Sequence, residues 1–308
     1  MGWLRWIGFG LVAVILLICG LLAPAHLQIR ELDPDPPPVA ALLALDAEAD
    51  RPVRLGWMET SRQPSFSPPP RVLSHPSFAL EWKDGRILLI DLGMSPEAAR
   101  EFGAPFESLG AGPVEVFGSV GEMLGDAADR VAGVVITHLH IDHVEGARSL
   151  CEVRGGAALP IFQVRAQAEL TNYGTRSTSE LVDEVGCLNR TVVPEGNAVA
   201  LPGFPGVALI HAAGHTPGSQ MLAASIAGPE GTKRVIFTGD VVNDIESARL
   251  DRPKALIYRL LIVPEADGQL SRIRRFLAGL ERDHGFSLAI AHDGDHVASL
   301  GLPGVSGP

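Results

Sequence analysis

Three histidines and one aspartate lie within the six residues from His138 to His143, spaced as H-x-H-x-D-H. They follow the apolar segment 131–136, which predicts a buried β-strand. A helix would spread these side chains around its axis, whereas a tight turn after a strand can direct them into one pocket. Neutral imidazoles and carboxylates bind zinc, manganese or iron. The motif therefore predicts a metal site at the end of a strand.

Three later motifs carry further potential ligands. His215 lies in Gly-His-Thr-Pro-Gly, Asp240 closes Thr-Gly-Asp, and His292 follows an apolar segment near the C-terminus. Residues on loops at strand ends can be held in a fixed geometry by a rigid sheet. His296 is the alternative to His292, which we prefer because it directly follows the expected strand.

The elements expected to position these residues alternate between strands and helices. Asp84-Gly85 predicts a hairpin turn between two strands, the second of which leads to Asp91. Residues 269–282 predict an amphipathic helix. Further strands are expected at residues 207–211, 221–226, 235–237 and 288–291.

The ordered combination of motifs resembles the signature of the metallo-β-lactamase-like hydrolases, over about residues 72–296. The resemblance implies an α/β fold, a four-layer αββα sandwich with the site at one edge between two sheets. It implies that Asp91 orients the first histidine loop. It also implies two metal positions, the first held by His138, His140 and His215, the second by Asp142, His143 and His292, with Asp240 bridging both.

Two adjacent cations can acidify a shared water and polarise a carbonyl or phosphoryl oxygen. Asp142 is the predicted catalytic residue, because it can orient the hydroxide and pass a proton to the leaving group. We therefore predict a hydrolase with two divalent metal ions, in which a metal-bridging hydroxide attacks an ester or lactone carbonyl. Zinc is the preferred metal, with manganese or iron as alternatives.

Within the superfamily, the motifs are most similar to the N-acyl homoserine lactonase branch. A phosphodiesterase or thioesterase of the same fold, a di-iron redox protein and a non-catalytic membrane-tethered metal-binding module remain alternatives. The expected partner is a small-molecule substrate, because a net charge of -11 argues against nucleic acid. Tyr173 or Tyr258 could contact that substrate and His75 could line the pocket, although packing or surface roles are the preferred interpretation for all three.

The N-terminus predicts a membrane element. Residues 7–23 carry no charge, Arg5 precedes them, and Ala23-Pro24-Ala25 fits a cleavage site. We expect either an uncleaved transmembrane helix or a cleaved signal, with a buried helix as the third alternative. If the helix is an anchor, the catalytic domain would face the periplasm or cell exterior. If the segment is cleaved, the protein would be secreted or periplasmic.

The predicted organisation has three parts. These are a signal peptide or transmembrane anchor over residues 1–25, a proline-rich linker and N-terminal extension over 26–70, and a catalytic domain over 71–308. Three cysteines are present and none forms a C-x-x-C pair, which argues against a thiolate zinc site. Cys151 and Cys187 could form a disulfide in an exported domain, but two free thiols are the preferred interpretation.

Overall fold

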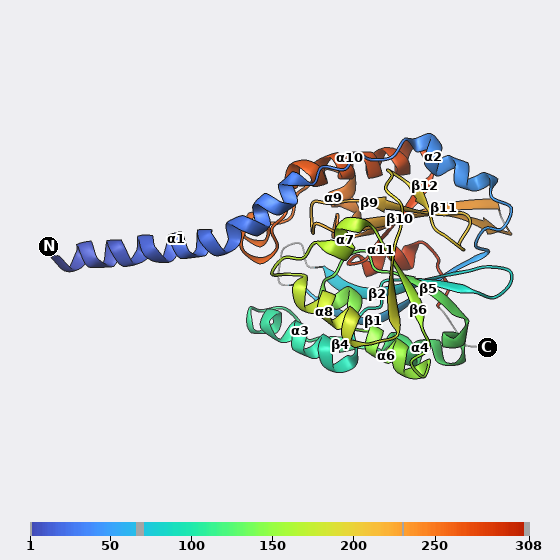
Figure 1. Ribbon diagram of the computed structural model, residues 1–308, viewed down its shortest axis with the longest axis horizontal. Helices are drawn as coiled ribbons and strands as arrows, with labels where there is room; N and C mark the ends of the chain where they lie inside the picture. The colour runs from blue at the N-terminus through green and yellow to red at the C-terminus, as the bar shows by residue number, and fades with distance from the viewer. Residues whose placement is uncertain (1, 66–70, 230, 305–308) are drawn as a thin grey trace.

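The computed structural model describes residues 2–65, 71–229 and 231–304. Two β-sheets form its centre, and helices lie on their outer faces (Figure 1). The larger sheet has the strand order β4-β1-β2-β3-β5-β6-β7, and the smaller has the order β12-β11-β10-β9-β8. This architecture confirms the predicted α/β sandwich.

The strands of the larger sheet are β1 (Arg54–Pro64), β2 (Val72–Glu81), β3 (Ile87–Ile90), β4 (Glu115–Val116), β5 (Val131–Val135), β6 (Leu159–Gln163) and β7 (Leu188–Val192). Those of the smaller sheet are β8 (Val199–Ala200), β9 (Val207–His211), β10 (Gln220–Gly228), β11 (Gly231–Gly239) and β12 (Phe286–Ile290). The predicted hairpin turn joins β2 to β3, which pair antiparallel.

The helices are α1 (Gly2–Glu31), α2 (Val39–Leu43), α3 (Pro96–Ser108), α4 (Val120–Leu124), α5 (Ile141–Val144), α6 (Ala147–Val153), α7 (Arg165–Glu169), α8 (Arg176–Glu184), α9 (Ile245–Arg249), α10 (Asp267–His284) and α11 (Gly294–Ser299). Three short helical turns are η1 (Ala44–Ala47), η2 (Gly125–Arg130) and η3 (Tyr258–Ile262). The predicted amphipathic helix is α10, which ends where Gly285 adopts a left-handed conformation.

Three apolar clusters hold the layers together. The central cluster joins the two sheets, with the Phe78 ring of β2 lying 5.1 Å from the Phe237 ring of β11. A second cluster packs α4, α6 and α8 on the larger sheet, and a third packs α2, α9 and α10 on the smaller one. Each amphipathic helix therefore buries its apolar face against one sheet, which leaves the strand ends free to carry polar groups.

Strand β1 differs from the predicted organisation, which placed its residues in the N-terminal extension. It pairs antiparallel with β2 from Arg54 to Pro64, with a register shift between Glu59 and Ser61. The flanking prolines and glycine obscure the strand pattern in the sequence. Residues 54–64 are therefore part of the sheet that carries the site.

Helix α1 extends away from the body (Figure 1). Its last turns contact the folded body, since Ile29 is fully buried and His26 Nε2 lies 3.0 Å from the backbone oxygen of Leu260. Across the described residues, no helix combines the length and apolar character needed to cross a membrane. The predicted membrane segment at residues 7–23 is therefore not supported: these residues belong to a helix that continues to Glu31 and ends against the domain.

Cys151 of α6 and Cys187, next to β7, form a disulfide, with their Cα atoms 5.8 Å apart. The preferred prediction of two free thiols was wrong. The sequence separation of 36 residues gave no sign of proximity, and folding brings α6 against the strand that follows α8. The only free cysteine of the described residues is Cys19, which is exposed on α1.

Removing the disulfide should lower stability, because the bond restricts the unfolded chain across 36 residues. The chain-entropy relation gives a loss of about 3–4 kcal/mol for a loop of that length. We expect Cys151→Ser to lower the denaturant midpoint, with Cys19→Ser as the matched control that leaves it unchanged. Equal midpoints for Cys151→Ser and the wild type would contradict this assignment.

Candidate metal centre

The polar cluster lies where strands from both sheets end. In the larger sheet, β3 and β5 run parallel and lead to Asp91 and to the histidine motif. In the smaller sheet, β11 and β12 run parallel and lead to Asp240 and His292. Parallel neighbours end at the same edge, so residues distant in sequence meet here. Gly239, with φ +51, packs against Thr137 and allows the turn that carries Asp240.

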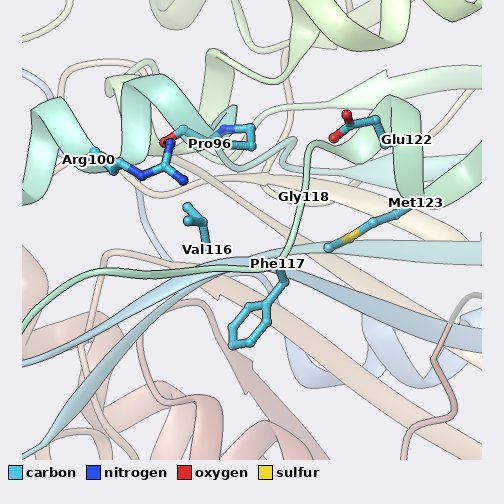
Figure 2. Close-up of a pocket in the computed structure, with 7 residues that line it drawn as sticks. All are labelled: Pro96, Arg100, Val116, Phe117, Gly118, Glu122 and Met123. Carbon is cyan, nitrogen blue, oxygen red and sulfur yellow. The ribbon is translucent and has the colours of Figure 1, made fainter.

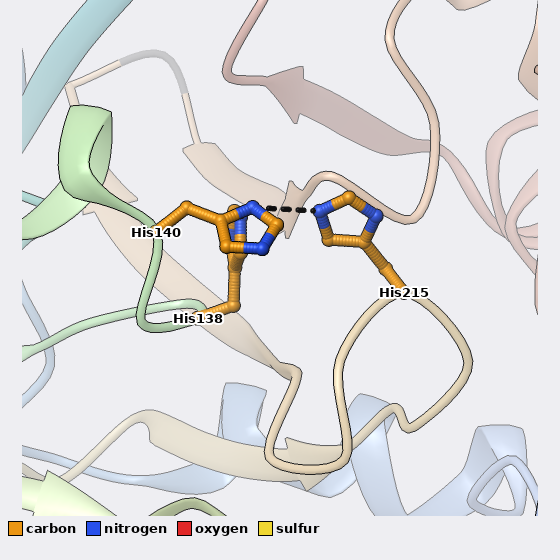
Figure 3. Close-up of side chains that lie close together, drawn as sticks. All are labelled: His138, His140 and His215. Carbon is orange, nitrogen blue, oxygen red and sulfur yellow. Dashed lines mark hydrogen bonds between the residues drawn. The ribbon is translucent and has the colours of Figure 1, made fainter. Parts of the chain in front are cut away.

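The first group contains three imidazoles, shown in Figure 3. His140 Nδ1 lies 2.9 Å from His138 Nε2 and 3.2 Å from His215 Nε2. Their three nitrogens face a common point, with His138 and His215 almost completely buried. Nitrogen atoms arranged in this way can bind one divalent cation.

The second group is built around two carboxylates. Asp142 Oδ2 lies 3.7 Å from His143 Nε2 and 3.5 Å from His292 Nε2. Asp240 lies between the groups: its Oδ1 is 3.3 Å from His143 Nε2, and its Oδ2 is 3.6 Å from His215 Nε2. The structure thus brings all seven sequence-predicted ligands together. His296 is outside the cluster, because its Nε2 faces the backbone oxygen of Leu288.

Outer contacts fix the orientation of these rings. Asp91, which adopts a left-handed φ of 55°, accepts hydrogen bonds from the backbone N–H and hydroxyl of Thr137, at 2.6 and 2.8 Å. Its Oδ2 is also 2.9 Å from His143 Nδ1. On the opposite side, His292 Nδ1 lies 2.9 Å from the backbone oxygen of Ser74. Both histidines therefore direct Nε2 toward the carboxylates, a common arrangement around metal sites.

The protonation states of His138, His140 and Asp240 suit metal binding. Burial lowers the pKa of His138 well below its usual value, and burial together with His215 lowers that of His140 to about 3. Both rings are therefore neutral at neutral pH. Burial alone would raise the pKa of Asp240, but His292, His138 and Lys254 keep it well below its usual range. Neutral imidazoles and ionised carboxylates are the forms that bind divalent cations.

Two buried atoms also indicate that the cluster is suited to hold metal ions. His143 Nε2 and Asp240 Oδ1 have no hydrogen-bond partner, although both lie inside the cluster. Leaving buried polar atoms unpaired is costly, and a cation between them would satisfy both. The residues present therefore fit a pair of divalent metal ions.

The sequence analysis missed Glu265 and Lys254. Glu265 Oε1 accepts a hydrogen bond from His215 Nδ1 at 2.6 Å, and Lys254 Nζ lies 2.9 Å from the same oxygen. Lys254 also donates to the backbone oxygen of Asp240 at 2.8 Å. Burial acts to raise the pKa of Glu265, but Lys254 and His215 lower it to about 2. No local motif marks these residues, which precede α10 and are positioned by tertiary folding.

The tyrosines singled out in the sequence differ in their surroundings. Tyr173 is 45% exposed. The Tyr258 ring lies 5.4 Å from Lys254 Nζ. Burial, then the charges of Asp240 and Glu265, raise the pKa of Tyr258 well above its usual value. Of the two tyrosines, Tyr258 is therefore the one whose pKa is raised by the carboxylates of the cluster.

A surface hollow of about 450 Å³ lies elsewhere, between α3 and α4 (Figure 2). It is lined by Pro96, Arg100, Val116, Phe117, Gly118, Glu122 and Met123. None of the clustered histidines or aspartates lines it, so it is separate from the candidate metal centre.

The family model of the metallo-beta-lactamase superfamily matches residues 70–300. The chain belongs to the metallo-β-lactamase superfamily. Its fold and its His/Asp clusters are those of a metal-dependent hydrolase of this superfamily. No curated protein matches it by sequence.

Solved structures of N-acyl homoserine lactonases share the fold of this superfamily member. An N-acyl homoserine lactone hydrolase with N-hexanoyl-L-homoserine at its catalytic metal centre is 21% identical, with a TM-score of 0.58 over 81% of this chain and 96% of that chain. An AiiA variant from B. thuringiensis with bound N-decanoyl-L-homoserine gives the same values. AidC, a dizinc quorum-quenching lactonase, is 12% identical, with a TM-score of 0.53 over 80% and 91% of the two chains.

Replacing Glu265 tests its role as the orienting partner of His215. Glu265→Gln keeps the size of the side chain but removes the charge that His215 and Lys254 both face. Loss of such a partner typically weakens metal binding by about 10–100-fold. We expect that decrease in chelator-competition measurements, while the exposed Glu195→Gln should bind as the wild type does. Unchanged affinity in Glu265→Gln would show that His215 needs no such partner.

Proposed function

We propose that this chain is a binuclear metal-dependent hydrolase that cleaves ester or lactone bonds. The observation that supports it most directly is the position of Asp240, which lies within 4.0 Å of His138 in the first group and 3.0 Å of His292 in the second. A carboxylate placed between two sets of donors is suited to bridge two cations. The geometry therefore favours a paired metal site over two independent ones.

His138, His140 and His215 would hold the first cation, Asp142, His143 and His292 would hold the second, and Asp240 would contact both. Bound there, two divalent cations would lower the pKa of a water molecule toward about 7 and polarise a carbonyl oxygen. Zinc is the preferred metal, since imidazole and carboxylate donors suit it. AidC, which shares the fold, is a dizinc enzyme.

The residues of the chain divide the remaining tasks. Asp142 lies at the edge of the cluster, where its carboxylate can orient the attacking water and pass its proton to the leaving oxygen. The protonated hydroxyl of Tyr258 can donate a hydrogen bond to a substrate oxygen, because its pKa is held high by burial and by Asp240. Both side chains therefore assist attack on an acyl carbon and departure of an alkoxide.

An acyl lactone or ester with an apolar chain fits the surroundings of the cluster. The segment that carries Tyr258 also exposes Leu256, Ile257 and Leu260, at 61%, 70% and 44%. Leu256 and Leu260 line a surface pocket together with Glu265, the partner of His215, so apolar side chains lie near the polar cluster. This combination favours an amphiphilic substrate. The N-acyl homoserine products bound in the structures of similar fold belong to this chemical class.

A substrate panel tests the reaction class. The metal-loaded protein should hydrolyse acyl homoserine lactones or aryl esters faster than thioesters or bis-aryl phosphates. Asp142→Ala should lower kcat/KM by at least about 100-fold, the range typical of lost proton transfer. Asp295→Ala, an exposed residue three positions after His292 and outside the metal centre, serves as the matched control. If the protein hydrolyses only phosphodiesters, the proposed ester or lactone substrate is wrong. A fully active Asp142→Ala would refute the proposed role of Asp142 in proton transfer.

We also propose that the folded body acts outside the cytoplasm, as the disulfide between Cys151 and Cys187 suggests. Structural disulfides persist in oxidising compartments and are rare in the cytosol. Thiols alkylated at the moment of cell lysis, followed by fractionation, should show the pair oxidised in the exported fraction. Recovery of the protein in the cytosolic fraction with both thiols reduced would refute this placement.

A further inference from the structure

His75 is a buried histidine beside the second group to which the proposed function gives no task. It lies on β2, in the larger sheet, and is only 3% exposed. Its ring packs edge-on against Phe102 at 5.5 Å and against His292 at 5.3 Å. Its Nδ1 lies 3.2 Å from the hydroxyl of Ser61 on β1, the neighbouring strand. That contact leaves Nε2 directed toward the carboxylates.

The distance from His75 to Asp142 is similar to the distances from the proposed ligands His143 and His292 to the same residue. His75 Nε2 lies 3.8 Å from Asp142 Oδ2, while His143 Nε2 and His292 Nε2 lie 3.7 and 3.5 Å from the same oxygen. A separation of 3.8 Å is too long for a hydrogen bond. Two donors that each bind one cation at about 2.1 Å can lie up to roughly 4.2 Å apart. The spacing therefore fits a shared cation.

The three donors form a compact set. The ligand atoms of His75, Asp142 and His292 all lie within 4.8 Å of one another, and all three residues are buried. When Nδ1 donates to Ser61, the lone pair of the neutral ring lies on Nε2 and faces this set. The Ser61 contact thus acts on His75 as Asp91 acts on His143, by fixing which nitrogen faces the centre.

We propose that His75 is an eighth metal ligand, binding the second cation together with Asp142 and His292. This inference rests on the proposed binuclear function and deepens it. Three imidazoles and two carboxylates then surround the second position, whereas three imidazoles and the shared Asp240 surround the first. Five protein donors require a cation that accepts five or six ligands, such as five-coordinate zinc, iron or manganese.

The test compares metal binding by the full-length protein and by four variants, His75→Gln, His296→Gln, His138→Ala and Ser61→Ala. His75→Gln keeps a polar side chain but removes the imidazole, and His296→Gln is the matched control, because His296 faces a backbone oxygen outside the cluster. Metal content and affinity for manganese and for zinc are measured by elemental analysis at graded chelator concentrations. We expect His75→Gln to release one cation at least about tenfold more readily than the wild type. We expect His296→Gln to be unchanged.

His138→Ala separates this inference from the proposed function. If His138→Ala loses metal while His75→Gln retains both cations with wild-type affinity, the role of His75 is refuted and the binuclear site stands. If neither variant changes metal content, both proposals fail. Cobalt-substituted protein gives a second measure, because removal of a ligand should change the intensity of its visible absorption, and identical spectra would count against His75.

A folding defect is distinguished from ligand loss by melting the metal-free proteins. Metal-free His75→Gln should melt at the wild-type metal-free temperature, and only the stabilisation by added metal should decrease. If His75→Gln does not fold, Ser61→Ala decides, since it retains the ring and removes only its Nδ1 partner. We expect Ser61→Ala to bind the second cation severalfold more weakly, and unchanged affinity would overturn the proposal.

Discussion

The centre depends on buried carboxylates and imidazoles that hydrogen-bond to one another and compensate one another's charge between the two sheets. Asp240 is 5% exposed and ionised, and removing such a charge from water costs several kcal/mol unless partners surround it. His292, His138 and Lys254 contribute to holding its negative charge. Because these partners lie in the loops after β5 and β12 and in the segment between α9 and η3, the charge at Asp240 can be stabilised only when both sheets are assembled.

Three of the rings that contact this charge have an outer partner that fixes their orientation. His143 has Asp91, His215 has Glu265, and His292 has the backbone oxygen of Ser74. A ring with one nitrogen fixed in this way presents the other to the centre without further loss of conformational entropy when a ligand binds. The centre is thus preorganised by contacts that lie outside it.

Short sequence motifs predicted the residues of this centre that lie in strand-end turns. The sequence predicts that the residues of four separate motifs meet. In the structure, the side chains of the motif from His138 to His143 lie together with those of His215, Asp240 and His292. Glu265 and Lys254 were not predicted, and His75 was expected in a packing or surface role. Their contacts with the centre join distant residues: Lys254 contacts Asp240, 14 residues before it, Glu265 contacts His215, 50 residues before it, and His75 faces Asp142, 67 residues after it. The pairing of Cys151 with Cys187 and the inclusion of β1 in the sheet likewise depend on tertiary contacts.

The two halves of the centre differ in how completely their side chains would surround a bound cation. The first group offers His138, His140 and His215, of which His140 is the most exposed, so one side remains open to solvent and substrate. The second group adds carboxylates from Asp142 and Asp240 and, with His75, is enclosed by β2 and by the loop after β12. An open position is where a carbonyl oxygen can be polarised, whereas a cation enclosed by donors is better suited to hold and orient water. The asymmetry agrees with the proposed function if the substrate binds on the side of His140, the least buried of the three rings in the first group.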